Sequence, residues 1–197
     1  LLGGREKNFS EYTRKIGWID PASELYLHGV RPGDEIVAYN GVEIQSTKEH
    51  TTAPMLSSGE LLVEGNYVDP YSKEKTPFKY LVHPYLHPSI VDKEILTAGI
   101  LHPASYVFYV PGEGENSLAG SPMEQSGILP EDRLVWMDGA PVYSLAQVAQ
   151  LLNDHKALLT IRRGEDLLLR RVPKVSVDEL RIEGEAREEV IDWQHEA

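Results

Sequence analysis

The chain has 197 residues, of which 41% are hydrophobic and 25% are charged, with no cysteine and a formal net charge of −12. This composition is typical of a globular protein with a packed core and excludes an intrinsically disordered chain. The charge argues against nucleic acid and anionic lipid surfaces as partners, because both attract clustered lysine and arginine. No disulfide or thiolate metal site can form, and no apolar run approaches the roughly 20 residues of a membrane-spanning helix.

The first residues, LLGG, show neither an initiator methionine nor a signal-peptide pattern. We therefore expect the chain to be a part of a longer protein. The next strong local signals are TRKIGWID at 13–20, which predicts a strand, and ASELYLHG at 22–29, which predicts a short helix.

An internal repeat then dominates the sequence. The segment GVRPGDEIVAYNG at 29–41 recurs as GILPEDRLVWMDG at 127–139, and the same offset of 98 residues relates Pro32 to Pro130 and Asp34 to Asp132 without insertion or deletion. Each copy predicts a turn at the proline, a strand of alternating period, and a tight turn at Asn-Gly or Asp-Gly. Such a register indicates two copies of one supersecondary unit.

The segments after each copy predict a helix and then a hairpin. In the second copy, Ser144 is a suitable N-cap, and Leu145, Val148, Ala149 and Leu152 share one helical face. In the first copy, STKEHTTAPML at 46–56 carries threonines and Pro54, which should weaken the helix or end it early. Hairpins are expected within 59–85 and 157–172, so the fold class is mostly antiparallel β with small helices (α+β).

These residues resemble a known family. HGVRPGDEIVAYNG at 28–41 and TIRRGEDLLL at 160–169 are similar to the PDZ domain in the permuted form of bacterial proteases, over residues 16–64 and 95–173. LTAGILHPASYVFYV at 96–110, followed by SPMEQSGILPEDRLV at 121–135, resembles the second PDZ domain of RseP-like site-2 (intramembrane zinc) proteases. The resemblance implies two PDZ-like, partly open barrels in tandem, at 1–90 and 91–176, with an acidic C-terminal segment or linker at 177–197.

The resemblance also implies where a peptide would bind. In permuted PDZ domains a glycine-containing loop receives a peptide's terminal carboxylate on its backbone N–H groups, and a helix flanks the peptide. The residues at matching positions are Leu2, Gly3 and Gly4 for the loop of the first copy, Thr51 and Met55 for its helix, Ala98, Gly99 and Ile100 for the loop of the second copy, and Gln147 and Leu151 for its helix.

The implied function is a peptide-binding region that gates or filters the substrates of a membrane-embedded zinc protease. The expected partner is a peptide C-terminus or a membrane-protein substrate, on the extracytoplasmic (periplasmic) face of a bacterial inner membrane. No HExxH motif and no nucleophile motif occurs in the chain, so we expect no catalysis by these residues and zinc only elsewhere in the parent protein. His-Pro steps at His83, His87 and His102 place those rings in extended or turning chain and argue against a metal site.

Two alternatives remain open at this stage. The chain could be the tandem PDZ region of an HtrA-type periplasmic serine protease, whose catalytic domain would precede Leu1. It could also be a non-catalytic interaction scaffold in which both peptide grooves are closed.

Overall fold

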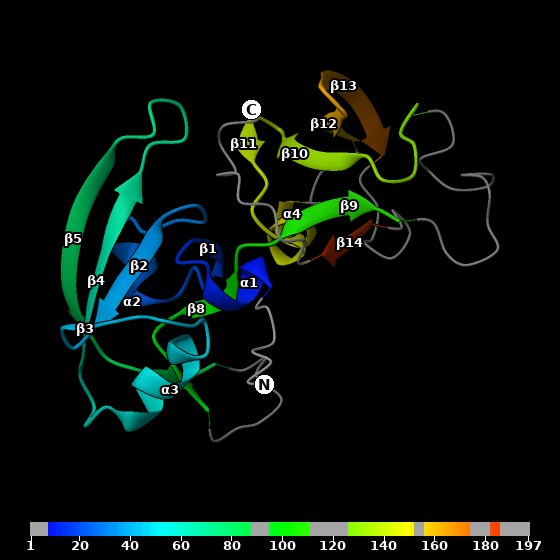
Figure 1. The fold of residues 1–197 in the computed structure, drawn as a ribbon. Helices are drawn as coiled ribbons and strands as arrows, with labels where there is room; N and C mark the ends of the chain where they lie inside the picture. Colours follow the sequence, from blue (N-terminus) through cyan, green and yellow to red (C-terminus); the bar gives the residue numbers. More distant parts are fainter. Residues whose placement is uncertain (1–7, 88–94, 111–125, 152–155, 174–181, 186–197) are drawn as a thin grey trace, which may run out of the picture. The chain divides into compact units, whose positions relative to one another are not determined.

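Antiparallel strands make up most of the two units, Leu1–Ala104 and Ser105–Ala197, into which the chain divides in this computed structural model. The structure describes residues 8–87, 95–110, 126–151, 156–173 and 182–185 (Figure 1). Both units combine strands with short helices, which confirms the expected mostly-β α+β class. None of the helices in these described ranges is long and apolar enough to cross a membrane.

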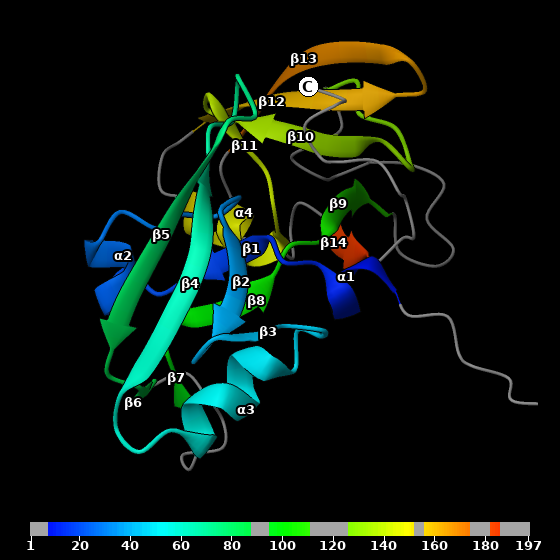
Figure 2. The same ribbon diagram turned by 60° about the vertical axis from the view of Figure 1, so that its left-hand side comes forward.

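The first unit contains three helices and eight strands. Its largest sheet has the order β3-β2-β4-β5, and two smaller antiparallel pairs, β1 with β8 and β6 with β7, complete it (Figure 2). The elements are α1 Phe9–Tyr12, β1 Ile16–Ile19, α2 Glu24–Leu27, β2 Glu35–Tyr39, β3 Val42–Glu43, α3 Glu49–Leu56, β4 Leu61–Val68, β5 Lys75–Val82, β6 Tyr85–Leu86, β7 Leu96–Thr97 and β8 Ile100–Pro103.

The second unit is built around one sheet. Its strand order is β13-β12-β10-β9-β14, and β11 pairs with β10 off this path. The elements are β9 Tyr106–Tyr109, β10 Arg133–Met137, β11 Ala140–Pro141, α4 Leu145–Leu151, β12 Lys156–Arg163, β13 Asp166–Pro173 and β14 Ile182–Glu185.

The repeat seen in the sequence is a repeat of structure. Shifting β2 and β3 by 98 residues gives the bounds of β10 and β11, and both connecting turns have positive φ at two consecutive residues. A buried aspartate closes the preceding turn in each copy: Asp34 Oδ2 accepts from Arg31 N at 2.8 Å, and Asp132 Oδ2 accepts from Leu129 N at 2.7 Å. The two units therefore share one local design.

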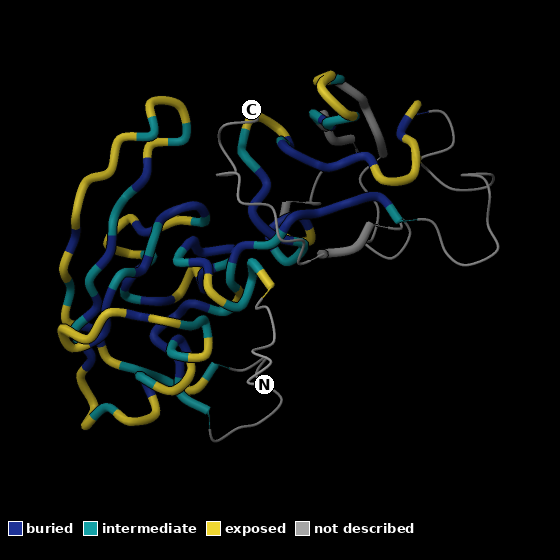
Figure 3. The backbone as a smooth tube through the Cα atoms, viewed as in Figure 1, coloured by how far each residue is buried: buried dark blue, intermediate teal, exposed yellow. Residues whose placement is uncertain are grey.

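The apolar core of the first unit lies between its sheet, α2 and the β1–β8 pair (Figure 3). Side chains along β4 alternate between buried and less buried, as expected for a strand with one face on the core. The cluster consists of Ile16, Ile19, Leu25, Val30, Ile36, Tyr39, Ile44, Leu61, Val63, Phe78, Val82, Ala98 and Ile100.

The unit boundary differs from the expected one at residue 90. Leu96–Thr97 pairs with β6, and Ile100–Pro103 pairs with β1, so these residues complete the first unit instead of beginning the second. The backbone changes unit within one peptide bond, because Ala104 N donates to Lys15 O while Ser105 N donates to Tyr143 O. The cause is the strand pairing, which no local sequence pattern specifies.

A matching correction applies to the C-terminal segment 177–197. Within it, Ile182–Glu185 forms β14, which pairs with β9 of the second unit, so the segment is not wholly a linker. Each unit is thus completed by a strand that follows its own hairpin: β8 in the first and β14 in the second. The capping box expected at Ser176 lies outside the described residues.

The helix of the first copy is also longer than Pro54 suggested. α3 runs for 8 residues with Pro54 inside it, and it ends at Leu56. Pro54 and His50 are both buried under the helix, so packing against the core compensates for the missing proline N–H. Helix propensity alone gave the wrong expectation here.

Candidate functional site

The candidate site lies in the first unit and is made of the loop Thr97–Gly99, the strand β8 that follows it, and the helix α3. α3 lies against β7, which enters the loop (Figure 2). The sequence analysis had placed Thr51 and Met55 in the first copy and Ala98, Gly99 and Ile100 in the second. The structure instead brings all five into one unit.

The glycine of the loop is held in a conformation that other residues rarely adopt. Gly99 has a φ of +108°, and a Cβ placed on it would lie 2.3 Å from Ser23 Cβ and 2.6 Å from Ser23 Oγ. Its N–H donates to Thr97 Oγ1 at 2.9 Å, and its carbonyl accepts from Asp20 N at 2.8 Å. Both the backbone angle and the space therefore require glycine at this position.

Asp20 connects this loop to the β6 region. Its carboxylate accepts from Ala22 N at 2.9 Å and from the Tyr85 hydroxyl, and His87 Nε2 lies 3.4 Å from Oδ2. Burial, followed by the contact with Asp20, raises the pKa of Tyr85, so the phenol stays a donor. The loop is thus fixed from behind by a polar network as well as by Ser23.

The side chains of the loop face the interior. Ala98 and Ile100 belong to the apolar core of the first unit, and Thr97 is buried beside them. Whatever this loop presents to a ligand must therefore come from its backbone. This agrees with the type of role expected from the sequence but moves it from the second copy to the first.

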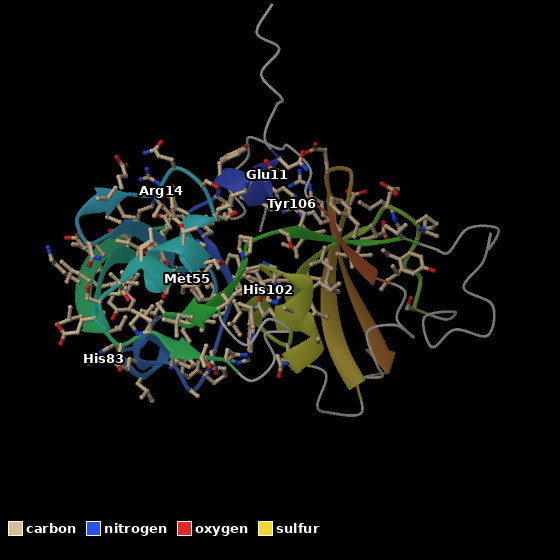
Figure 4. The ribbon with its side chains drawn as sticks, turned by 90° about the horizontal axis from the view of Figure 1, so that it is seen from below. Glu11, Arg14, Met55, His83, His102 and Tyr106 are labelled. Atoms are coloured by element: carbon tan, nitrogen blue, oxygen red, sulfur yellow. The ribbon has the colours of Figure 1, made fainter. Side chains whose placement is uncertain are left out.

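Helix α3 has two different flanks. His50 and Pro54 form its buried base, and at about 100° per residue Thr51 and Met55 share one flank while Thr52 and Leu56 share the other. The Thr52 flank faces a cavity shared with β2 and β3. The flank with Thr51 and Met55 is therefore turned away from β3; Figure 4 shows Met55 on α3 and His102 on β8 within this unit.

The second unit arranges its helix in a related way, with α4 lying against β14. Gln147, expected to flank a groove, is instead buried and uses both polar atoms internally: Oε1 accepts from Tyr143 N at 2.7 Å and Nε2 donates to Pro141 O at 2.9 Å. Ser144 Oγ accepts from Gln147 N, which completes a capping box. The spacing Ser-x-x-Gln was the sequence signal for this role.

The remaining expected site residues are outside what can be placed. Leu2, Gly3 and Gly4 lie outside the described residues, and so does the segment 174–181 that precedes β14. Leu151 ends α4. Among the described residues, no group of three or more His, Asp or Glu side chains could hold a metal ion. Zinc chemistry therefore cannot be assigned to them.

Comparison with known proteins gives two relatives that match over nearly all of this chain. One from Chlamydia pneumoniae is 35% identical over 199 aligned residues, covering 100% of this chain and 30% of that protein. One from Chlamydia trachomatis serovar D is 34% identical over 196 residues, covering 99% of this chain and 29% of that protein. Both carry the name "putative zinc metalloprotease". The chain is similar to a segment of zinc-metalloprotease relatives.

The chain spans about three tenths of the length of these relatives. No family model matches it. The names therefore speak for a protease-associated parent protein, and the role of this segment within such a parent has to be argued from the site.

Proposed function

We propose that the chain is a tandem of PDZ-type peptide-binding units in the extracytoplasmic part of a membrane-embedded zinc metalloprotease, where it filters substrates. The observation that carries this proposal is the meeting of α3, β8 and the loop Thr97–Gly99 in one unit. A helix beside a strand that follows a glycine loop is the arrangement by which a peptide C-terminus is bound as an added strand.

The binding mode follows from the backbone of the first unit. β8 uses one edge to pair with β1, so a peptide in extended form would lie along its other edge, beside the α3 flank that carries Thr51 and Met55. We call this region the peptide slot. The terminal carboxylate would meet backbone N–H groups of the loop, which Ser23 and Asp20 hold in place before a ligand arrives.

Such a slot suits a filter because it recognises a free chain end. A membrane-protein substrate would expose a suitable C-terminus only after an earlier cut, and binding it would admit the substrate to a catalytic centre elsewhere in the parent. The names of the relatives support a zinc centre over the serine-protease alternative. In this proposal, the periplasmic side of the membrane is where these units work.

The test is calorimetric titration of residues 1–197 with synthetic heptapeptides that end in Ala, Val, Leu or Phe and carry a free carboxylate. Gly99→Ala should weaken binding at least tenfold, because its Cβ would displace Ser23 and the loop with it. Gly59→Ala is the matched control: Gly59 has a φ of +103° but nothing within 4 Å of its Cβ position. Amidated peptides should also bind at least tenfold more weakly.

Two results would contradict the proposal. Equal affinity of free-acid and amidated peptides would show that no carboxylate site exists in the slot. Equal loss in Gly99→Ala and Gly59→Ala would show that backbone strain, and not the loop's position, controls binding.

A further inference from the structure

A cavity on the other flank of α3 is separate from the peptide slot. It has a volume of about 260 Å³ and lies between α3 and the strands β2 and β3. Its apolar surface comes from Val42 and Ile44 on the strand side and from Ala53 and Leu56 on the helix. Val42 is 72% exposed and Leu56 is 85% exposed, so apolar atoms at the cavity mouth meet solvent. Large apolar side chains left in this way indicate a surface that something covers.

Two carboxylates also line the cavity. Glu43 lies on β3, where its partner among the described contacts is Arg14, and Glu49 lies in the first turn of α3, where Oε2 accepts from Gln45 N at 2.7 Å. Like charges at one cavity repel each other when no cation lies between them. A ligand that brings a positive charge would relieve this repulsion.

The second unit shows what replaces these carboxylates elsewhere. At the positions 98 residues later, Glu43 and Glu49 correspond to Pro141 and Gln147, and Gln147 Nε2 donates to Pro141 O at 2.9 Å. That bond ties α4 to β11 within the unit itself. A pair of glutamates cannot make such a bond, because neither carboxylate has a proton to donate near neutral pH. The first unit is therefore built to take its donor from another segment.

The N-terminal helix leads to the end of this cavity. Glu11 O, in α1, accepts from Thr47 N at 2.9 Å, and Arg14 pairs with Glu43 on the cavity wall. Residues 1–7 precede this helix and read LLGGREK: two leucines, two glycines and two basic residues separated by a glutamate. Seven extended residues reach about 23 Å, whereas Thr47 and Glu49 are two residues apart in the chain. The segment is long enough and has the complementary chemistry.

We propose that residues 1–7 of this chain dock in the cavity between α3 and β3, with Leu1 and Leu2 on its apolar surface and Arg5 or Lys7 beside Glu43 and Glu49. The role that the sequence analysis gave to Leu2, Gly3 and Gly4 is filled in the first unit by the loop Thr97–Gly99. Docking would support α3 from the side opposite the peptide slot. The segment before α1 would thereby control how firmly that helix is held.

Engineered cysteine pairs test this directly, because the chain has no cysteine of its own. Leu2→Cys combined with Leu56→Cys joins the segment to the cavity flank, and Leu2→Cys combined with Met55→Cys joins it to the slot flank. Both helix positions are exposed. Each rate of disulfide formation is divided by the reactivity of the single Leu56→Cys or Met55→Cys variant toward Ellman's reagent, which corrects for accessibility.

We expect the corrected rate for the Leu56 pair to exceed that for the Met55 pair at least fivefold. Charge reversal at Arg5 and Lys7 to Glu should reduce this preference at least threefold and leave the circular dichroism spectrum unchanged. Equal corrected rates would overturn the proposal. A preference for Met55 would also overturn it and would return Leu2 to the peptide slot. Peptide binding does not enter these measurements, so they fail or succeed independently of the proposed function.

Discussion

His50 is a buried histidine whose ionisation should make the first unit sensitive to acid. It lies under α3 with 5% of its surface exposed, and its Nδ1 is 2.7 Å from the Tyr39 hydroxyl. Its Nε2 has no hydrogen-bond partner among the described residues. Burial lowers the pKa of His50 to about 4 from a usual value of 6.5. The folded protein therefore holds this ring neutral.

The size of the effect follows from linkage between proton binding and folding. Because the folded pKa is depressed, the stability contributed by neutral His50 is present above pH 6.5 and is lost as the pH falls toward 4. With these two pKa values, the free energy of unfolding should drop by about 2 kcal/mol between pH 7 and pH 5, and by about 3 kcal/mol by pH 4.

The second unit supplies the matched substitution. Val148, 98 residues after His50, is buried in α4 and does not titrate. His50→Val should therefore fit under α3, and Tyr39→Phe should accompany it so that no buried hydroxyl loses its partner. Both proteins would carry Trp136→Phe and Trp193→Phe, so that the fluorescence of Trp18 reports urea unfolding of the first unit from pH 4.5 to 7.5.

The double variant should show a dependence on pH that is smaller than that of its parent by about 2 kcal/mol between pH 7 and pH 5. All other titrating groups are common to both proteins and cancel in this difference. Parallel curves for the two proteins would refute the reasoning, because they would mean that His50 is protonated to the same extent in the folded and unfolded states.

Two further substitutions test how the units are completed. A Cβ on Gly17 would lie 2.2 Å from Pro103 O, so Gly17→Ala should force β1 and β8 apart and cost about 1–3 kcal/mol in urea unfolding. Gln147→Glu keeps the acceptor for Tyr143 N but removes the donor to Pro141 O, so it should destabilise the second unit by about 1–2 kcal/mol at neutral pH.

Each of these has its own check. For Gly17, the Gly59→Ala variant gives the cost of an alanine at a positive φ without a clash, and an equal or smaller loss at Gly17 would contradict the close approach of β1 and β8. For Gln147, the alanine variant should lose the interaction with Tyr143 as well. A stability of Gln147→Glu equal to that of the parent would show that the bond to Pro141 contributes nothing.

Much of the local structure could be predicted from particular residues. Asn40-Gly41 and Asp138-Gly139 form the expected tight turns with positive φ, and the strands before them lie where the alternating patterns place them. Both predicted hairpins form. These successes share one cause, since turn chemistry and side-chain alternation are decided by residues that are neighbours in the chain.

The errors have a different common cause. Gln147 was expected to face a groove because its place on the helix was judged from apolar residues alone, and its capping bonds to Tyr143 and Pro141 were missed. α3 was expected to be weak because of Pro54, yet packing of the helix base on the core maintains it. In both helices, contacts outside the local pattern determined the outcome.

The sequence by itself determined that the chain contains two copies of a turn, strand and turn, and that each copy is followed by a helix and a hairpin. Only the tertiary structure decided which unit receives the residues around Gly99. β8 pairs with β1 across more than 80 positions of sequence, and β14 pairs with β9 in the same manner. Main-chain hydrogen bonds are made by every residue except proline at its N–H, so a short apolar strand does not name its partner. The pairing is chosen by the core that Ala98 and Ile100 complete, and that choice places the candidate peptide slot in the first unit.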